Sequence, residues 1–127
     1  MTKNIMLTGG LGFIGSHTAV ELINEGYSVF ILDNLSNSSE SVVESIKAIT
    51  GKEVFFCEGD IRDELMVGRF LQANEIDSVV HFAGSKSVNE SVSAPLHYYD
   101  NNVIGTISLL KAMTRHGIKN LIFSSSA

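Results

Sequence analysis

The amino-acid sequence predicts an α/β fold, in which helices cover a doubly wound parallel sheet of five strands. Short apolar runs alternate with longer segments of helical spacing along all 127 residues. Such alternation is typical of parallel strands joined by right-handed helical crossovers. A glycine-rich segment also lies where the first strand is expected to meet the first helix. For this arrangement we expect the strand order 3-2-1-4-5.

Five short apolar runs are expected to form the strands. Strands of a parallel sheet are covered on both faces, so they are apolar throughout rather than alternating with polar residues. The runs that fit this description are Ile5–Thr8, Val29–Leu32, Val54–Cys57, Ser78–Phe82 and Leu121–Ser124. Cys57, the one cysteine of the chain, is therefore expected to be buried in a strand.

Four helices are expected between these strands. The first runs over 13–25, the second stops at Gly51, the third starts near Asp63, and the fourth extends from just after Pro95 to His116. Aspartate suits the residue before a helix, proline suits its first turn, and glycine suits the residue that follows it. The expected glycine caps are Gly26, Gly51 and Gly117. The apolar stripes expected on the second and third helices are Val42, Val43, Ile46 and Ile49, and Met66, Val67, Phe70 and Leu71.

Composition and charge exclude several classes of protein. Hydrophobic residues make up 44% of the chain and charged residues 18%, which excludes intrinsic disorder. The formal charge is −5 and there is no basic stripe, so we expect no nucleic-acid partner. One cysteine and four scattered histidines form no metal-binding pattern. No apolar run approaches the roughly 20 residues of a membrane span, and we expect a cytoplasmic protein without a membrane partner.

The sequence ends directly after the fifth predicted strand. An uncovered parallel edge strand invites pairing with another chain. We therefore expect residues 1–127 to be an incomplete N-terminal domain of a longer protein.

The strongest local signal is the glycine-rich segment Thr8–Gly15. Its glycines fit both G-x-G-x-x-G and G-x-x-G-x-x-G. Between a strand and a helix, such glycines permit a tight turn and let the backbone approach a pyrophosphate, which the helix N-terminus stabilises. The alternative is a plain turn, because a glycine pattern alone has little specificity.

Two acidic residues follow later strands. Asp33 closes the second predicted strand, 18 residues after Gly15, where an acid accepts hydrogen bonds from an adenosine ribose. A carboxylate there repels a 2′-phosphate, so NAD is favoured over NADP; the alternative is a simple turn residue. Asp60 follows the third strand, where it would either meet the adenine or cap the next helix.

These motifs together resemble the N-terminal part of the extended short-chain dehydrogenase/reductase family, and within it the enzymes that act on sugar nucleotides. The resemblance covers the whole chain. The segments that carry it are Thr8–Thr18, Leu32–Ser38, Glu58–Arg62, His81–Val88, Tyr98–Val103 and Phe123–Ala127. It implies a Rossmann-like fold that binds NAD.

The resemblance also assigns roles to individual residues. Those implied to bind the cofactor are Gly9, Gly12, Phe13, Ile14 and Gly15 near the pyrophosphate, Asp33, Asn34, Asn37 and Ser38 around the ribose, Asp60 and Ile61 at the adenine, and Phe82, Ala83, Gly84, Lys86, Asn101 and Ser124 towards the nicotinamide. Ser126 is implied to be the catalytic serine, and Lys86 and Ser126 are implied to meet the substrate. Most of these residues lie at strand ends on one edge of the predicted sheet, where open α/β sheets bind ligands.

The activity implied by the resemblance is epimerisation at C4 of a UDP-hexose through a transient 4-keto sugar. The family's Tyr-x-x-x-Lys pair is absent from these 127 residues and is expected beyond Ala127, together with the substrate domain. Two alternatives remain open at this point. One is a related sugar-nucleotide dehydratase or reductase, and the other is an NAD-binding module without catalysis.

The fourth predicted helix carries more apolar surface than one buried face requires. One stripe contains Leu96, Tyr99, Val103, Ile107 and Leu110, while other apolar residues lie on different faces. By family resemblance this helix belongs to a homodimer interface. The alternative is that further residues of the same chain cover it.

Overall fold

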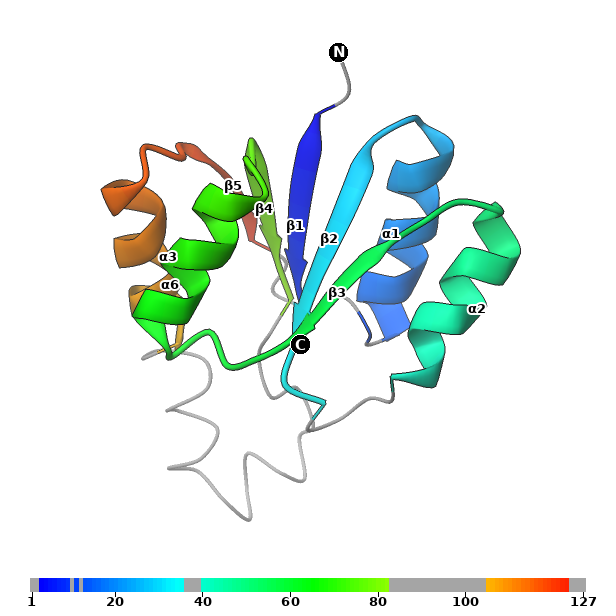
Figure 1. Ribbon diagram of the computed structural model, residues 1–127, viewed down its shortest axis with the longest axis horizontal. Helices are drawn as coiled ribbons and strands as arrows, with labels where there is room; N and C mark the ends of the chain where they lie inside the picture. The colour runs from blue at the N-terminus through cyan, green and yellow to red at the C-terminus, as the bar shows by residue number, and fades with distance from the viewer. Residues whose placement is uncertain (1–2, 10, 12, 36–39, 83–104, 124–127) are drawn as a thin grey trace.

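The computed structural model describes residues 3–9, 11, 13–35, 40–82 and 105–123 (Figure 1). In this part of the chain, five parallel strands form one sheet in the order β3-β2-β1-β4-β5. The strands are β1 (Asn4–Thr8), β2 (Ser28–Asp33), β3 (Phe55–Glu58), β4 (Ser78–His81) and β5 (Asn120–Phe123). The predicted α/β fold and strand order are confirmed.

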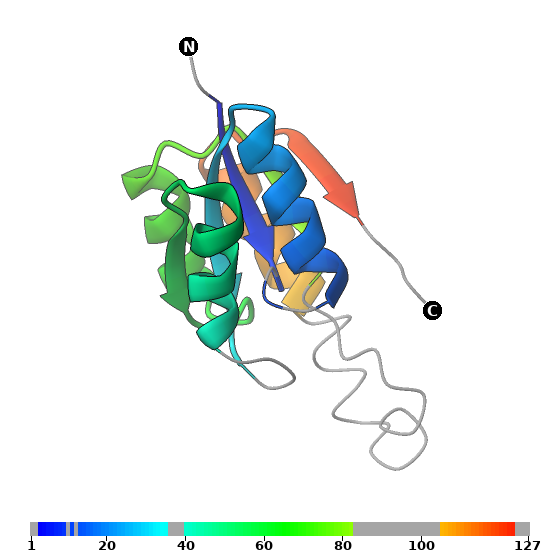
Figure 2. The ribbon, with the colours of Figure 1, turned by 90° about the vertical axis from the view of Figure 1, so that its right-hand side faces the viewer.

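Helices cover both faces of the sheet. They are α1 (Phe13–Asn24), α2 (Ser41–Thr50), α3 (Glu64–Ala73) and α6 (Gly105–Arg115). Helices α1 and α2 lie on one face, and α3 and α6 lie on the other (Figures 1 and 2). Each face has its own buried apolar cluster, with Leu7 and Ile31 in the first and Met6 and Leu32 in the second. Successive residues of β1 and β2 thus point to opposite faces, as a doubly covered sheet requires.

The helix ends follow the predicted capping chemistry. The Asp63 side chain accepts a hydrogen bond from the backbone N–H of Met66 at 3.2 Å, so Asp63 caps α3. Gly51 follows α2 with a φ of 67° and donates its N–H to the carbonyl of Lys47 at 2.8 Å. This left-handed conformation favours glycine over residues with a side chain.

Two predictions of burial are wrong, and both concern the β3 edge of the sheet. Ile49 is 69% exposed, because α2 packs over this edge and buries only Val43 and Ile46. The third strand begins one residue later than predicted, at Phe55, and Cys57 within it is half-buried rather than buried. An edge strand has a neighbour on one side only, so its side chains are less covered.

The other boundaries within the described residues differ by at most one residue, while the predicted start of the fourth helix after Pro95 and the stripe residues Leu96, Tyr99 and Val103 lie outside them. β4 ends at His81 rather than Phe82, and the described part of the fourth helix ends at Arg115 rather than His116. Ser124, predicted to end β5, lies outside the described residues. None of the helices described is long and apolar enough to cross a membrane.

Candidate cofactor site

Five of the predicted site residues lie at the carboxyl edge of the sheet. Asp33 is the last residue of β2 and the exposed Asn34 comes directly after it, while Gly9, Asp60 and Phe82 follow β1, β3 and β4 within two residues. Parallel strands bring these positions to the same edge. The predicted residues outside the described part of the chain are Gly12, Asn37, Ser38, Ala83, Gly84, Lys86, Asn101, Ser124 and Ser126.

The glycine-rich segment makes the turn that its composition predicts. Gly9 has a φ of 72° and donates its N–H to the carbonyl of Leu32 at 2.8 Å, so the chain turns sharply beside β2. Helix α1 starts at Phe13, Ile14 in its first turn is 44% exposed, and Gly15 is buried. The accessible first turn of a helix, with its outward N–H groups and positive dipole, suits a phosphate.

Asp33 joins β2 to this glycine-rich turn. Its side chain is buried, with Oδ2 accepting the backbone N–H of Leu11 at 3.1 Å and Oδ1 accepting that of Leu35 at 2.7 Å. Leu35 has a φ of 62°, so the chain turns immediately after the strand. The sequence did not single out Leu11, because its contact with Asp33 arises only when two strand ends meet in the folded chain.

Asp60 is bonded to Arg62 rather than to the next helix. Its Oδ1 accepts the backbone N–H of Arg62 at 2.9 Å, and both carboxylate oxygens accept Nε–H of the guanidinium at 3.0 Å. These bonds hold the pKa of the Asp60 carboxyl below its usual value. The capping alternative for Asp60 is therefore wrong, since Asp63 caps α3. Like the contact between Leu11 and Asp33, this pairing of Arg62 with Asp60 was not predicted from the sequence.

Ile61 and Phe82 contribute core packing at this edge. Their side chains are buried in the clusters on opposite faces of the sheet. A β-carbon added to Gly105 would lie 2.7 Å from Cδ1 and 2.9 Å from Cγ1 of Ile61. Gly105 thus permits α6 to approach the segment that carries Asp60.

A buried polar network links β1, β4 and α6 beside the same edge. Thr8 Oγ1 lies 2.5 Å from Nδ1 of His81, and Nε2 of His81 lies 3.0 Å from Oγ1 of Thr106. Thr8 Oγ1 also accepts the backbone N–H of Phe82 at 3.2 Å. These contacts are all satisfied when the Thr8 hydroxyl donates to His81 Nδ1 and His81 Nε2–H donates to Thr106. His81 thus has a structural role here, which its sequence context did not predict.

The residues present fit a dinucleotide. A left-handed glycine turn, an accessible helix start and a buried acid ending β2 lie together, and each matches one part of such a ligand. In the part of the chain that the structure describes, no group of three or more His, Cys, Asp or Glu residues is arranged to hold a metal ion.

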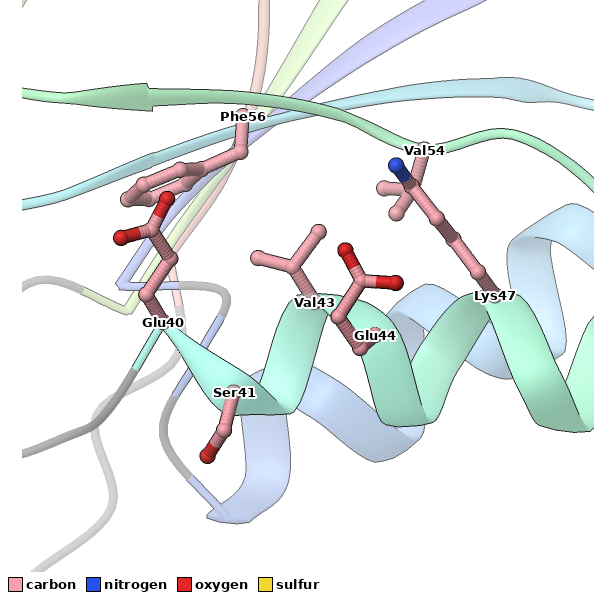
Figure 3. A pocket seen from close by; sticks show the side chains of 7 residues that line it. All are labelled: Glu40, Ser41, Val43, Glu44, Lys47, Val54 and Phe56. Carbon is pink, nitrogen blue, oxygen red and sulfur yellow. The ribbon is translucent and has the colours of Figure 1, made fainter.

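A separate hollow of about 470 Å³ lies between α2 and β3 (Figure 3). Glu40 and Glu44 line it, and its lysine, Lys47, lies 3.4 Å from Glu53 in an ion pair. This acidic lining does not suit a pyrophosphate, so the carboxyl edge remains the candidate cofactor site.

The comparisons with known proteins agree with this geometry. The family model described as GDP-mannose 4,6 dehydratase matches residues 6–127. The chain belongs to the extended short-chain dehydrogenase/reductase family. Within that family it is 54% identical over 125 residues to UDP-glucose 4-epimerase of Neisseria meningitidis serogroup A, covering 98% of this chain and 37% of the relative. It is also 53% identical over 123 residues to UDP-glucose 4-epimerase of Klebsiella pneumoniae, covering 97% of this chain and 88% of that relative.

A solved member of the family has the same fold. UDP-glucose 4-epimerase from Stenotrophomonas maltophila, with bound NAD and formylated UDP-arabinopyranose, superimposes with a TM-score of 0.96 at 50% identity. The match covers 98% of this chain and 37% of that structure. The chain thus spans little more than a third of the length of the Neisseria meningitidis relative and of this solved structure.

Proposed function

We propose that the protein containing this chain is an NAD-dependent UDP-hexose 4-epimerase, and that residues 1–127 form part of its N-terminal cofactor-binding domain. The observation that carries the proposal is the buried Asp33 carboxylate bonded to the glycine-rich turn, in a chain of the epimerase-containing family. A cytoplasmic location is part of the same proposal, since a single cysteine suits a reducing compartment.

Asp33 gives the cofactor preference its physical basis. Its carboxylate oxygens accept the backbone N–H groups of Leu11 and Leu35, which fixes the position of the carboxylate at the end of β2. In this proposal the carboxylate faces the hydroxyl groups of the ribose. A 2′-phosphate would bring negative charge against this buried acid, which supports NAD rather than NADP.

The remaining assignments extend the site along the same edge. In this proposal the first turn of α1, including Ile14, faces the pyrophosphate, Asn34 lies near the ribose, and Asp60 lies at the adenine. Lys86 and Ser126 would meet the substrate. The bound nicotinamide supplies the acceptor and donor of hydride at C4 of the sugar. Ser126 would donate a hydrogen bond to the C4 oxygen as charge develops there.

The proposal is tested on the full-length protein with UDP-galactose. We expect conversion to UDP-glucose, and we expect Ser126→Ala to lower kcat by about 10²–10³ while the bound NAD content stays the same. Ser125→Ala is the matched control, with a much smaller loss. A product that has lost water would instead indicate a dehydratase, the activity after which the matching family model is named. Bound NAD without turnover of any sugar nucleotide would indicate a binding module.

A homodimer is the partner state that we propose. Helix α6 buries Leu109 and Ala112 against the domain, whereas Ile107 and Leu110 are 48% and 43% exposed on its other side. These two residues line a shallow surface hollow together with Lys111, Thr114 and Arg115. An apolar strip of this kind on a surface helix suits packing against the same helix of a second copy.

A further inference from the structure

The imidazole ring of His81 joins the end of β1 to α6. Thr8 and His81 are the last paired residues of strands β1 and β4, and both side chains are buried. Oγ1 of Thr8 lies 2.5 Å from Nδ1 of His81, and Nε2 of His81 lies 3.0 Å from Oγ1 of Thr106. Each nitrogen of the ring therefore has a hydroxyl partner, one on a neighbouring strand and one on the helix that covers it.

The Thr8 side chain in turn holds the first residue beyond β4. The backbone N–H of Phe82 donates to the Thr8 carbonyl at 2.7 Å and to the Thr8 hydroxyl oxygen at 3.2 Å. A hydroxyl can accept one hydrogen bond and donate another, so the Thr8 hydroxyl can bond Phe82 and His81 together. His81 thus restrains the Thr8 side chain, and Thr8 restrains the chain where it leaves β4.

These contacts lie between the two strands whose connections leave for opposite faces of the sheet. β1 continues into α1 on one face, whereas the helix described after β4 is α6, on the other face (Figures 1 and 2). Open α/β sheets bind their ligands beyond the carboxyl ends of such a pair of strands. Asp33 and Asp60 end or follow β2 and β3, to one side of this point. An adenosine bound at those acids leaves the rest of a dinucleotide beside β1 and β4.

The polar contacts of His81 are set in an apolar surrounding. Met6 and Val79 precede Thr8 and His81 by two residues, so they point to the same face of the sheet, and both belong to its buried apolar cluster. Apolar side chains of the same shape would cost little stability here, because a buried hydrogen bond largely replaces one made to water. A ring bonded at both nitrogens, however, is held in one orientation. The network is therefore better suited to fixing the spacing of β1 and β4 than to stabilising the fold.

We propose that His81 is a positioning residue for the nicotinamide half of the cofactor. The inference rests on the proposed function, which places the adenosine half at Asp33 and Asp60. Through Thr8, His81 fixes the spacing between the carboxyl ends of β1 and β4, and through Thr106 it ties these ends to α6. Loss of the network weakens the binding of the nicotinamide half and slows the reaction there, whereas the adenosine half keeps its contacts.

The test compares NAD⁺ with AMP, which is the adenosine half of the same cofactor. Full-length protein freed of cofactor is titrated with each, and the measured quantity is the Kd for AMP divided by the Kd for NAD⁺. This ratio reports what the nicotinamide half contributes to binding, and a general loss of stability does not change it in a folded variant.

His81→Gln is the decisive variant. The glutamine amide can still donate to Thr106, but the Thr8 hydroxyl loses its acceptor, so we expect the ratio to fall about tenfold. The kcat of the NAD-loaded variant with UDP-galactose should fall by about 10- to 100-fold, because small misplacements of reacting groups are costly. His81→Asn has the complementary effect, since its shorter amide can accept from Thr8 but does not reach Thr106. Its ratio should fall by about threefold.

Two controls accompany these variants. Thr106→Val removes the hydroxyl but keeps the shape, and its ratio should also fall by about threefold, whereas Thr106→Ser keeps the hydroxyl and should retain the ratio of the unmodified protein. His116→Asn changes a half-buried histidine that follows α6 and packs against Gly68, at the amino ends of the strands. It should leave the ratio unchanged.

The outcomes distinguish the inference from the proposed function. A lowered unfolding free energy in His81→Gln with an unchanged ratio would show that the network serves stability alone, and would overturn the inference. A larger fall in His81→Asn than in His81→Gln would overturn the part assigned to Thr8. If neither His81 variant folds, equal ratios in Thr106→Val and Thr106→Ser would overturn the inference, and a lower ratio in Thr106→Val would support it. Failure of the unmodified protein to bind NAD⁺ would overturn the proposed function itself.

Discussion

The Asp33 carboxylate accepts the backbone N–H of Leu11 at 3.1 Å, although the two residues are 22 positions apart in the chain. This bond joins the end of β2 to the glycine-rich turn that follows β1. Leu11 is buried, so the donor has no access to water as a replacement partner. Asp33 therefore has two tasks in the proposed site: it faces the ribose, and it holds the turn that faces the pyrophosphate.

For this reason we expect Asp33→Asn and Asp33→Ala to have similar effects on the cofactor preference but different effects on the free energy of unfolding. Both remove the charge that opposes a 2′-phosphate, so both should relax the preference for NAD over NADP. Asp33→Ala also leaves the buried Leu11 N–H without its acceptor, at a cost of about 1–3 kcal/mol in the free energy of unfolding. Asp33→Asn keeps one acceptor oxygen, so it should lower the free energy of unfolding by a smaller amount.

The measurements are dissociation constants for both dinucleotides and urea unfolding of the full-length protein. Asp77→Asn is a suitable control, since Asp77 comes directly before β4 and so lies at the amino ends of the strands, away from the carboxyl edge that carries Asp33. Equal binding of NAD and NADP by the unmodified protein would count decisively against the assignment of Asp33.

The Asp60–Arg62 pair should make stability depend on pH in the acid range. The pKa of Asp60 lies below its usual value of 3.8 in the folded protein. The pair therefore contributes stability above about pH 3.8 and loses it as the pH falls through the lowered pKa. Both side chains are about one-third exposed, so we expect a contribution of only a few tenths of a kcal/mol, and at most about 1.

This contribution is measured as the difference in unfolding free energy between the unmodified protein and Arg62→Ala. The difference should be present at pH 6 and should shrink towards pH 3. Arg69→Ala, which removes an exposed arginine of α3, is the control and should show no such pH trend. A difference that grows on acidification would contradict the stated direction of the pKa.

Most of the fold could be predicted from the sequence, because it depends on local patterns. Apolar runs specify the strands, helical spacing specifies the helices, and crossover rules then restrict the strand order. The cap at Asp63 was predicted for the same reason, since it needs only Asp63 and the next turn. Ile49 was mispredicted because its exposure depends on where α2 ends over the edge of the sheet.

The candidate site was predicted less completely. Gly9 and Asp33 belong to a recognisable motif, and the structure brings them to one edge. The bond between Thr8 and His81 joins residues 73 positions apart, and no local pattern indicates it. Arg62 is near Asp60 in sequence, but only the folded turn shows that its guanidinium pairs with that acid.

Thr8→Val tests the buried network around His81. Valine keeps the shape of threonine but removes the hydroxyl that is hydrogen-bonded to His81 Nδ1, in a site where Thr8 is fully buried and His81 is almost so. We expect a loss of about 1–3 kcal/mol in unfolding free energy. Thr8→Ser keeps the hydroxyl and loses one methyl group, so it should cost about 1 kcal/mol. Urea unfolding that ranks the serine variant below the valine variant would refute this role.

Gly105→Ala should destabilise the protein, although alanine is the better helix former by about 1 kcal/mol. The added β-carbon would lie 2.7 and 2.9 Å from two carbon atoms of Ile61, which is buried. Overpacking of this kind costs about 1–3 kcal/mol. It should also weaken cofactor binding, because Ile61 adjoins Asp60.

Gly68→Ala is the matched control for this change. Its β-carbon would meet Nε2 of His116 at 2.7 Å, at the far end of a half-buried side chain that can turn aside. We expect its unfolding free energy to stay within about 1 kcal/mol of that of the unmodified protein. If Gly105→Ala were as stable as Gly68→Ala, the packing of α6 against Ile61 would not constrain this site.

Ile107→Glu should convert the proposed homodimer into monomers. Ile107 is 48% exposed and lies beside Leu110 on the outer side of α6, whereas the buried side of that helix carries Leu109 and Met113. A glutamate placed between two copies would have to lose its hydration without gaining a partner, so association should weaken by at least about tenfold. The inner packing of α6 is untouched, and thermal stability of the separated subunit should stay close to that of the unmodified protein at equal dilution.

Leu65→Glu is the control, because Leu65 is 63% exposed on α3 and does not line this surface. Sedimentation equilibrium of the full-length proteins measures the effect. An unmodified protein that sediments as a monomer, or an Ile107→Glu variant that dimerises as tightly as Leu65→Glu, would show that α6 does not form the interface.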